Sequence, residues 1–143
     1  MKIVYQEEIT PELISLMKIY WHSVDLKPVT EDFGWLTETM VILAYEDDQK
    51  LPVGVVYARN DAGVIYLDTI IVELNHEGKG IGHALLTELE KKAKEKNAHK
   101  IYLHTRNEWE AVKLYEEFEY KKTADLPNHY LKLDWVEYTK FLS

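Results

Sequence analysis

A glycine-rich stretch near the middle of the chain is the clearest candidate for chemistry. Glu77-Gly78-Lys79-Gly80-Ile81-Gly82 follows an apolar run that ends at Val72, and helical spacing begins directly after it. Glycine permits positive φ and lets the backbone approach a ligand closely. The N–H groups at the start of a helix point outward at the positive end of its dipole. This arrangement predicts an anion site, most often for phosphate; the alternative is a helix start that needs glycine only for tight packing.

Two common phosphate motifs do not fit this stretch. A Walker loop requires G-x-x-x-x-G-K-[ST], and that spacing is missing. The dinucleotide fingerprint G-x-G-x-x-G also fails, because its sixth position is His83 when counted from Gly78 and Leu85 when counted from Gly80. A nucleotide-binding enzyme is therefore the least favoured function for this turn.

A carboxylate within an apolar strand is the second candidate. Asp68 interrupts Tyr66-Leu67-Asp68-Thr69-Ile70, where a buried charge without a partner would be costly. Such a residue is either a proton acceptor or a hydrogen-bonded structural aspartate. His104, at the end of a later strand, is another candidate base, and a chain of water molecules would need no residue. The sequence lacks H-E-x-x-H and G-x-S-x-G, so we expect neither a catalytic metal nor a serine nucleophile.

The composition limits the functions that these residues can serve. The 143 residues are 46% apolar and 29% charged, which predicts one globular domain over residues 1–143. The absence of cysteine excludes disulfides, thiolate metal sites and a covalent cysteine intermediate. The formal charge of −8 argues against nucleic acid as a partner and favours cationic ligands. Because there is no long apolar run and no signal peptide, we expect no membrane contact and a cytoplasmic location.

The hydrophobic pattern indicates the elements that position these residues. Strand-like patterns cover residues 2–6, 40–45, 52–59, 64–72, 100–104, 120–123 and 129–135. Helical spacing covers residues 11–24, 31–37, 78–97 and 108–117. The strands before and after the 78–97 helix should be parallel neighbours, joined by a right-handed crossover. The predicted fold is α/β, with a mixed, mostly antiparallel sheet, one central parallel strand pair and about four flanking helices.

Two motifs and this order of elements resemble the GNAT superfamily of acyl-CoA-dependent N-acyltransferases. The family pattern [Q/R]-x-x-G-x-G/A corresponds to residues 77–82. A second block, N-x-x-A-x-x-L-Y-x-x-x-G-F, is matched by Asn107, Ala111, Leu114, Tyr115 and Tyr120. The resemblance covers nearly the whole chain.

Three positions depart from the family pattern. Glu77 replaces the usual Gln or Arg and puts a negative charge beside the expected pyrophosphate, so its side chain must turn outward or affinity will suffer. Glu119 replaces a glycine, and Asn107 lies four residues before Ala111 instead of three.

The resemblance implies an N-acetyltransferase that moves an acetyl group from acetyl-CoA directly to a primary amine of a small molecule or peptide. It implies that Tyr115 protonates the departing CoA thiolate, and Asp68 lies near where family members often carry an acid. The pantetheine arm would pair with the backbone of residues 70–72, beside the splayed parallel strands. The residues expected to bind acetyl-CoA are Ile70, Ile71, Val72, Gly78, Lys79, Gly80, Ile81, Gly82, His83 and Asn107.

Other features keep two interpretations each. Lysines outnumber glutamates over residues 78–100, which is either a basic rim for the CoA phosphates or a solvated helix face. The two early helices carry the aromatic residues Tyr20, Trp21, Phe33 and Trp35. These side chains either line an acceptor pocket or belong to the core. His129 could line the same acceptor pocket. Glu77 and Glu119 leave open an inactive acyl-CoA-binding or protein-interaction module of the same fold. Exposed strand edges would allow a homodimer.

Overall fold

The computed structural model describes residues 1–23, 37–47 and 49–142, which belong to two compact units, residues 1–34 and 35–143. The first unit contains helix α1 (Pro11–Ser23). Thr10 caps this helix, since its Oγ1 accepts a hydrogen bond from the Leu13 N–H at 3.3 Å. The predicted strand over residues 2–6 is wrong. These residues are exposed and form no strand pairing with the described part of the chain, and a weakly alternating segment gains little without a partner strand.

The second unit is built on a six-stranded sheet in the order β1-β2-β3-β4-β6-β5. Its strands are β1 (Thr37–Ala44), β2 (Gly54–Asp61), β3 (Val64–Val72), β4 (Lys100–Thr105), β5 (Lys121–Leu126) and β6 (Trp135–Phe141). All neighbouring strands are antiparallel except β3 and β4, which are parallel as predicted. The sheet therefore consists of two antiparallel halves that meet at one parallel junction.

This parallel junction is short. Cα pairing joins residues 64–66 of β3 to residues 100–102 of β4 and then stops, although both strands continue. From there β4 pairs only with β6, through Thr105 and Val136. The two halves of the sheet consequently part at the carboxyl ends of β3 and β4, as expected for strands that hold a ligand between them.

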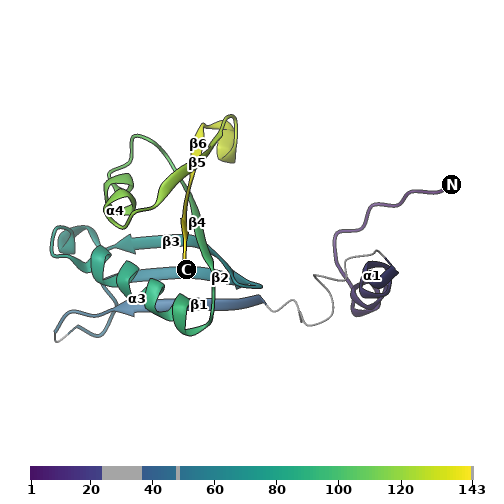
Figure 1. Ribbon diagram of the computed structural model, residues 1–143, viewed down its shortest axis with the longest axis horizontal. Helices are drawn as coiled ribbons and strands as arrows, with labels where there is room; N and C mark the ends of the chain where they lie inside the picture. Colours follow the sequence, from purple (N-terminus) through teal and green to yellow (C-terminus); the bar gives the residue numbers. More distant parts are fainter. Residues whose placement is uncertain (24–36, 48, 143) are drawn as a thin grey trace. The chain divides into compact units, whose positions relative to one another are not determined.

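Helix α3 (Ile81–Glu95) covers one face of β1, β2 and β3, as Figure 1 shows. Four of its apolar side chains are buried, as the predicted helical spacing implies: Leu85, Leu86, Leu89 and Ala93. These side chains pack on Ile65 and other inward-facing residues of the strands. Apolar burial of this kind is the main stabilising term for the fold, and it fixes the start of α3 at the end of β3.

The remaining elements correct the predicted count and bounds. The described residues contain three α-helices instead of about four: α1, α3 and α4 (Ala111–Glu117). Most of the helix predicted over residues 31–37 lies outside the described residues, and Thr37 begins β1. Two short 3₁₀ turns, η1 (Leu74–His76) and η2 (Tyr130–Lys132), complete the set. No helix in the described ranges is long and apolar enough to cross a bilayer.

The last predicted strand was placed too early. Residues 129–134 form a connection around η2, and β6 begins only at Trp135. Leu131 and Lys132 have φ of 57° and 60°, which a strand cannot accommodate. Their apolar and long side chains nevertheless gave the segment a strand-like pattern.

Candidate active site

The glycine turn lies between β3 and α3, where the sequence predicted an anion site. Gly78 and Gly80 have φ of 76° and 81°, in the left-handed region that disfavours other residues. A Cβ at either position would meet no atom within 4 Å, so backbone conformation and not crowding requires glycine here. Gly80 is the N-cap of α3 and makes no side-chain capping bond. The first N–H groups of α3 are therefore available to an external acceptor.

The turn forms one wall of a pocket of about 490 Å³. Ile70 and Val72 of β3 contribute apolar side chains, and the start of α3 contributes Ile81, Gly82 and His83. The opposite wall is one face of α4 and the residue before it, formed by Glu110, Ala111, Lys113, Leu114 and Glu117. An apolar channel that ends at a helix N-terminus suits an extended ligand with a terminal phosphate.

The sequence motifs predicted only part of this wall. Ala111 and Leu114 were recognised in the second family block, whereas Glu110, Lys113 and Glu117 were not considered. Their spacing of three and four residues along the chain places them on one helical face with the recognised pair. That periodicity could have identified them.

The pocket is lined by three carboxylates, of which the sequence motifs indicated only Glu77. Glu77, Glu110 and Glu117 line it, together with one lysine, Lys113. Glu117 Oε2 lies 2.6 Å from His83 Nε2, so the contact joins the start of α3 to α4 across the pocket. Both side chains are more than half exposed, so this contact adds little stability by itself. A phosphate at the start of α3 would compete with the Glu117 carboxylate for His83 Nε2.

The lysines of residues 79–100 do not form part of this pocket lining. Several of them instead contact glutamates: Lys79 with Glu46 at 4.0 Å, Lys92 with Glu95 at 3.0 Å and Lys96 with Glu38 at 2.6 Å. This arrangement supports the interpretation of α3 as a solvated face with ion pairs.

Tyr115 is buried beneath the pocket and does not line it. It is 5% exposed, and its ring centroid lies 6.0 Å from that of Tyr120 and 6.4 Å from that of Tyr138. Burial raises the pKa of the Tyr115 hydroxyl to about 12, because the charged phenolate is poorly solvated there. The side chain therefore keeps its proton over the neutral range, as an acid must before it donates one.

Asp68 is not the buried carboxylate that its apolar surroundings predicted. The pairing of β3 with β2 jumps from Thr69 opposite Tyr57 to Leu67 opposite Ala58, so Asp68 is the extra residue of a β-bulge. Its side chain is exposed and accepts a hydrogen bond from Thr69 Oγ1 at 2.7 Å. The bulge turns the carboxylate outward, and the expected cost of burying it does not arise.

The other predicted residues occupy separate places. Ile71 is exposed and is not part of the pocket lining. Asn107 lines a second pocket of about 410 Å³, between the end of β4 and the β5–β6 connection. His104 is largely buried, with Nδ1 3.0 Å from the Tyr130 hydroxyl and Nε2 3.4 Å from Glu137 Oε1. His129 lies beside it, with ring centroids 5.5 Å apart.

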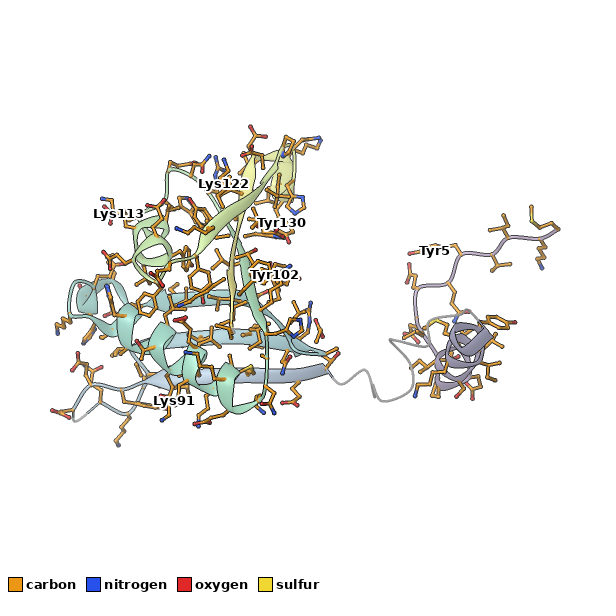
Figure 2. The ribbon with its side chains drawn as sticks, viewed as in Figure 1. Tyr5, Lys91, Tyr102, Lys113, Lys122 and Tyr130 are labelled. Atoms are coloured by element: carbon orange, nitrogen blue, oxygen red, sulfur yellow. The ribbon has the colours of Figure 1, made fainter. Side chains whose placement is uncertain are left out.

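His104 and its partners lie on the opposite face of the sheet from α3. Its β4 neighbours Ile101 and Leu103 belong to the core under the helix, and alternate residues of a strand point to opposite faces. Figure 2 shows Tyr102 and Tyr130 close together beside β4, on the other side from Lys113 of α4. The described chain thus offers two candidate surfaces, one on each side of the gap between β3 and β4.

Comparisons with known proteins agree with this arrangement. Residues 10–120 match the model of the acetyltransferase (GNAT) family. No curated protein sequence matches the chain. An acetyltransferase from Bacillus cereus ATCC 14579 has a similar structure, with 19% identity, a TM-score of 0.72 and coverage of 97% of this chain and 98% of that one.

Two further solved structures have the same fold over a shorter part of the chain. The NatC complex bound to a Gag peptide and CoA has 21% identity and a TM-score of 0.68, covering 72% of this chain and 71% of that one. The ribosomal-protein-S18-alanine N-acetyltransferase from Escherichia coli has 16% identity and a TM-score of 0.67, covering 73% and 70%. At these identities the likeness concerns the fold.

Proposed function

The chain belongs to the GNAT acetyltransferase family, and we propose that it transfers an acetyl group from acetyl-CoA directly to a primary amine of a small molecule or peptide. The observation that carries this proposal is the glycine turn, which leaves the first N–H groups of α3 free at the end of an apolar pocket. Two similar structures support the choice of ligand and acceptor. One holds CoA and a peptide, and the other is named for acetylating an alanine nitrogen.

Acetyl-CoA would lie in the pocket between β3 and α4. The pyrophosphate accepts hydrogen bonds from the N–H groups of residues 81–83 and the turn before them. The pantetheine arm runs along Ile70 and Val72, which line the pocket on its β3 side, and a backbone N–H at this strand end polarises the thioester carbonyl. Glu77 and Glu117 lie near the phosphates, so we expect the affinity to be moderate.

The transfer occurs within a complex of both substrates, because the chain has no cysteine to carry the acetyl group. The neutral amine attacks the thioester carbon, the C–S bond breaks and the sulfur accepts a proton from Tyr115. A free thiol has a pKa of about 8.5, below that of Tyr115, but an apolar site raises the pKa of the thiol as well. The amine nitrogen loses a proton to a base, for which Asp68 and His104 are the candidates.

Calorimetric titration with acetyl-CoA tests the binding half of this proposal. We expect micromolar binding of acetyl-CoA and none of ATP or NADH, because both nucleotide fingerprints fail in the glycine turn. Tighter binding of ATP or NADH would instead support a nucleotide-binding enzyme. A chain that binds none of the three would share the fold of the family without its ligand.

Release of CoA thiol in the presence of an amine panel tests the transfer half. The panel comprises spermidine, an aminoglycoside, L-lysine and an alanyl peptide, because the acidic chain favours cationic acceptors. Acetyl-CoA binding without thiol release for any amine would favour the acyl-CoA-binding module. The three carboxylates in the pocket keep that second function under consideration.

A further inference from the structure

A hydrogen-bonded network of three side chains, Tyr130, His104 and Glu137, lies where the two halves of the sheet part. His104 comes two residues after the last β4 residue that pairs with β3, and it pairs with Glu137 on β6. Its side chain is 15% exposed. Tyr130, from the β5–β6 connection, is 45% exposed and extends this network towards solvent. The histidine is thus covered, and the tyrosine is the member that a substrate can reach.

The partners of His104 fix its tautomer. An ionised carboxylate only accepts hydrogen bonds, so the Nε2 that faces Glu137 carries the hydrogen of the neutral imidazole. The opposite nitrogen, Nδ1, is then an acceptor and takes the hydrogen of the Tyr130 hydroxyl. Thr123 Oγ1 donates to the second oxygen of Glu137 at 2.8 Å and holds that carboxylate in place.

The β5–β6 connection has the conformation needed to place Tyr130 over His104. Asn128, Leu131 and Lys132 all have positive φ, of 49°, 57° and 60°. Such conformations are unfavourable for residues other than glycine and persist only where the surroundings enforce them. The indole N–H of Trp135 donates to the Tyr130 carbonyl at 2.9 Å, and the two rings pack edge to face at 5.2 Å. Tyr66, on β3, is also near Tyr130: burial, and secondly the Tyr130 side chain, raise the pKa of the Tyr66 hydroxyl.

We infer that the Tyr130 hydroxyl is the substrate-facing end of a proton relay that continues through His104 to Glu137; this inference rests on the proposed acetyl transfer. As the amine nitrogen bonds to the thioester carbon, its proton passes to Tyr130 Oη. The hydroxyl hydrogen of Tyr130 passes at the same time to His104 Nδ1, so the phenol stays neutral. Glu137 stabilises the resulting imidazolium through the Nε2 hydrogen, and His104 later returns the proton to solvent.

The groups around His104 are consistent with this role. Tyr66 from β3 and Tyr102 from β4 have rings within 6 Å of the imidazole, and burial raises the pKa of both hydroxyls. They therefore remain neutral and do not compete for the proton. His129 and Tyr130 face the imidazole from the β5–β6 connection, and Glu137 faces it from β6. Glu137 is thus the only carboxylate among the described groups that contact the imidazole.

The relay is tested by the pH dependence of kcat with the best amine of the panel. Tyr130→Phe removes the hydroxyl and keeps the ring, and His104→Gln removes the proton acceptor. We expect each variant to lower kcat by about 10²-fold. The double variant should have nearly the same kcat as either single variant, because both substitutions interrupt the same proton path. His104→Gln should also change the pH profile of kcat, because it removes the group that takes up the proton. The Kd for acetyl-CoA, measured by calorimetry, should stay within twofold and confirm that each variant is folded.

Tyr57→Phe is the matched control, because Tyr57 is an exposed tyrosine on β2, and its kcat should equal that of the unmodified chain. The relay is overturned if Tyr130→Phe keeps both kcat and the pH profile of the unmodified chain. It is also overturned if the losses of the two single variants multiply in the double variant. If the unmodified chain binds acetyl-CoA but acetylates no amine, the proposed function fails, and the relay fails with it.

Discussion

Tyr115 and Tyr120 have neighbouring buried rings, yet we expect them to differ in function. Tyr115→Phe removes the proposed acid next to the pocket-lining Leu114 and should lower kcat by about 10²-fold with an unchanged Kd for acetyl-CoA. Tyr120 is 2% exposed, so its hydroxyl is shielded from solvent in the core. Tyr120→Phe should therefore leave kcat unchanged. Steady-state thiol release and calorimetry measure the two effects. Equal kcat for Tyr115→Phe and the unmodified chain would exclude the acid role.

The Tyr120 hydroxyl also has a predicted effect on stability. It is buried, and the described structure gives it no hydrogen-bond partner. Burial and the nearby Glu90 raise its pKa well above the ordinary tyrosine value, so it stays neutral but unsatisfied. Removing such a group relieves a desolvation penalty, and Tyr120→Phe should raise the free energy of unfolding by about 1 kcal/mol. Urea denaturation tests this, and a loss of stability would show that the hydroxyl has a partner.

At the scale of single residues, the sequence predicted what depends on local backbone chemistry. Gly78 and Gly80 were found because their positive φ restricts the residue type. The exposure of Asp68 was not predictable, because its bulge depends on the register between β2 and β3. The network of His104, Tyr130 and Glu137 was missed for the same reason. Its members come from separate segments, and only the pairing of β4 with β6 brings them together.

At the scale of elements, the start of α3 allows a paired test of its glycines. Gly80→Ala places a Cβ on a residue with φ of 81° and should destabilise the chain by about 1–2 kcal/mol. A Cβ on Gly82 would only touch Leu114 Cδ2 at 3.4 Å, an ordinary contact, and alanine favours the helix. Gly82→Ala should therefore not destabilise it. Urea denaturation compares the two, and equal changes in the free energy of unfolding would show that the positive φ of Gly80 adds no cost of its own.

The elements themselves were predicted best where the pattern was long and regular. The predicted strand over residues 64–72 has the observed bounds, and the long helix differs only at its ends. The connection before β6 was missed, because its conformation depends on contacts such as that of Trp135 with Tyr130. The strand predicted over residues 2–6 failed because alternation by itself does not supply a pairing partner.

At the scale of the whole molecule, negative charge should control the rate of acetyl-CoA binding. The chain has a formal charge of −8, and three carboxylates line the proposed phosphate pocket. Acetyl-CoA is itself an anion, so added salt should screen the repulsion and raise the association rate. Stopped-flow binding at increasing NaCl concentration measures this effect.

Two variants separate the pocket charges from the overall charge. Glu117→Gln removes a pocket carboxylate, and it should raise the association rate at low salt and reduce the salt dependence. Glu95→Gln makes the same charge change at the far end of α3, outside the pocket lining, and should have a smaller effect. An association rate that falls as salt is added would show that attraction and not repulsion dominates.

The short junction between β3 and β4 has a consequence for how the second unit opens. Only three residue pairs join the two antiparallel halves of the sheet along the strands. Each half should therefore behave as its own cooperative unit in native-state hydrogen exchange, with separate opening free energies. A ligand held between β3 and α4 would connect the halves, so acetyl-CoA should slow exchange in both and merge their protection into one value.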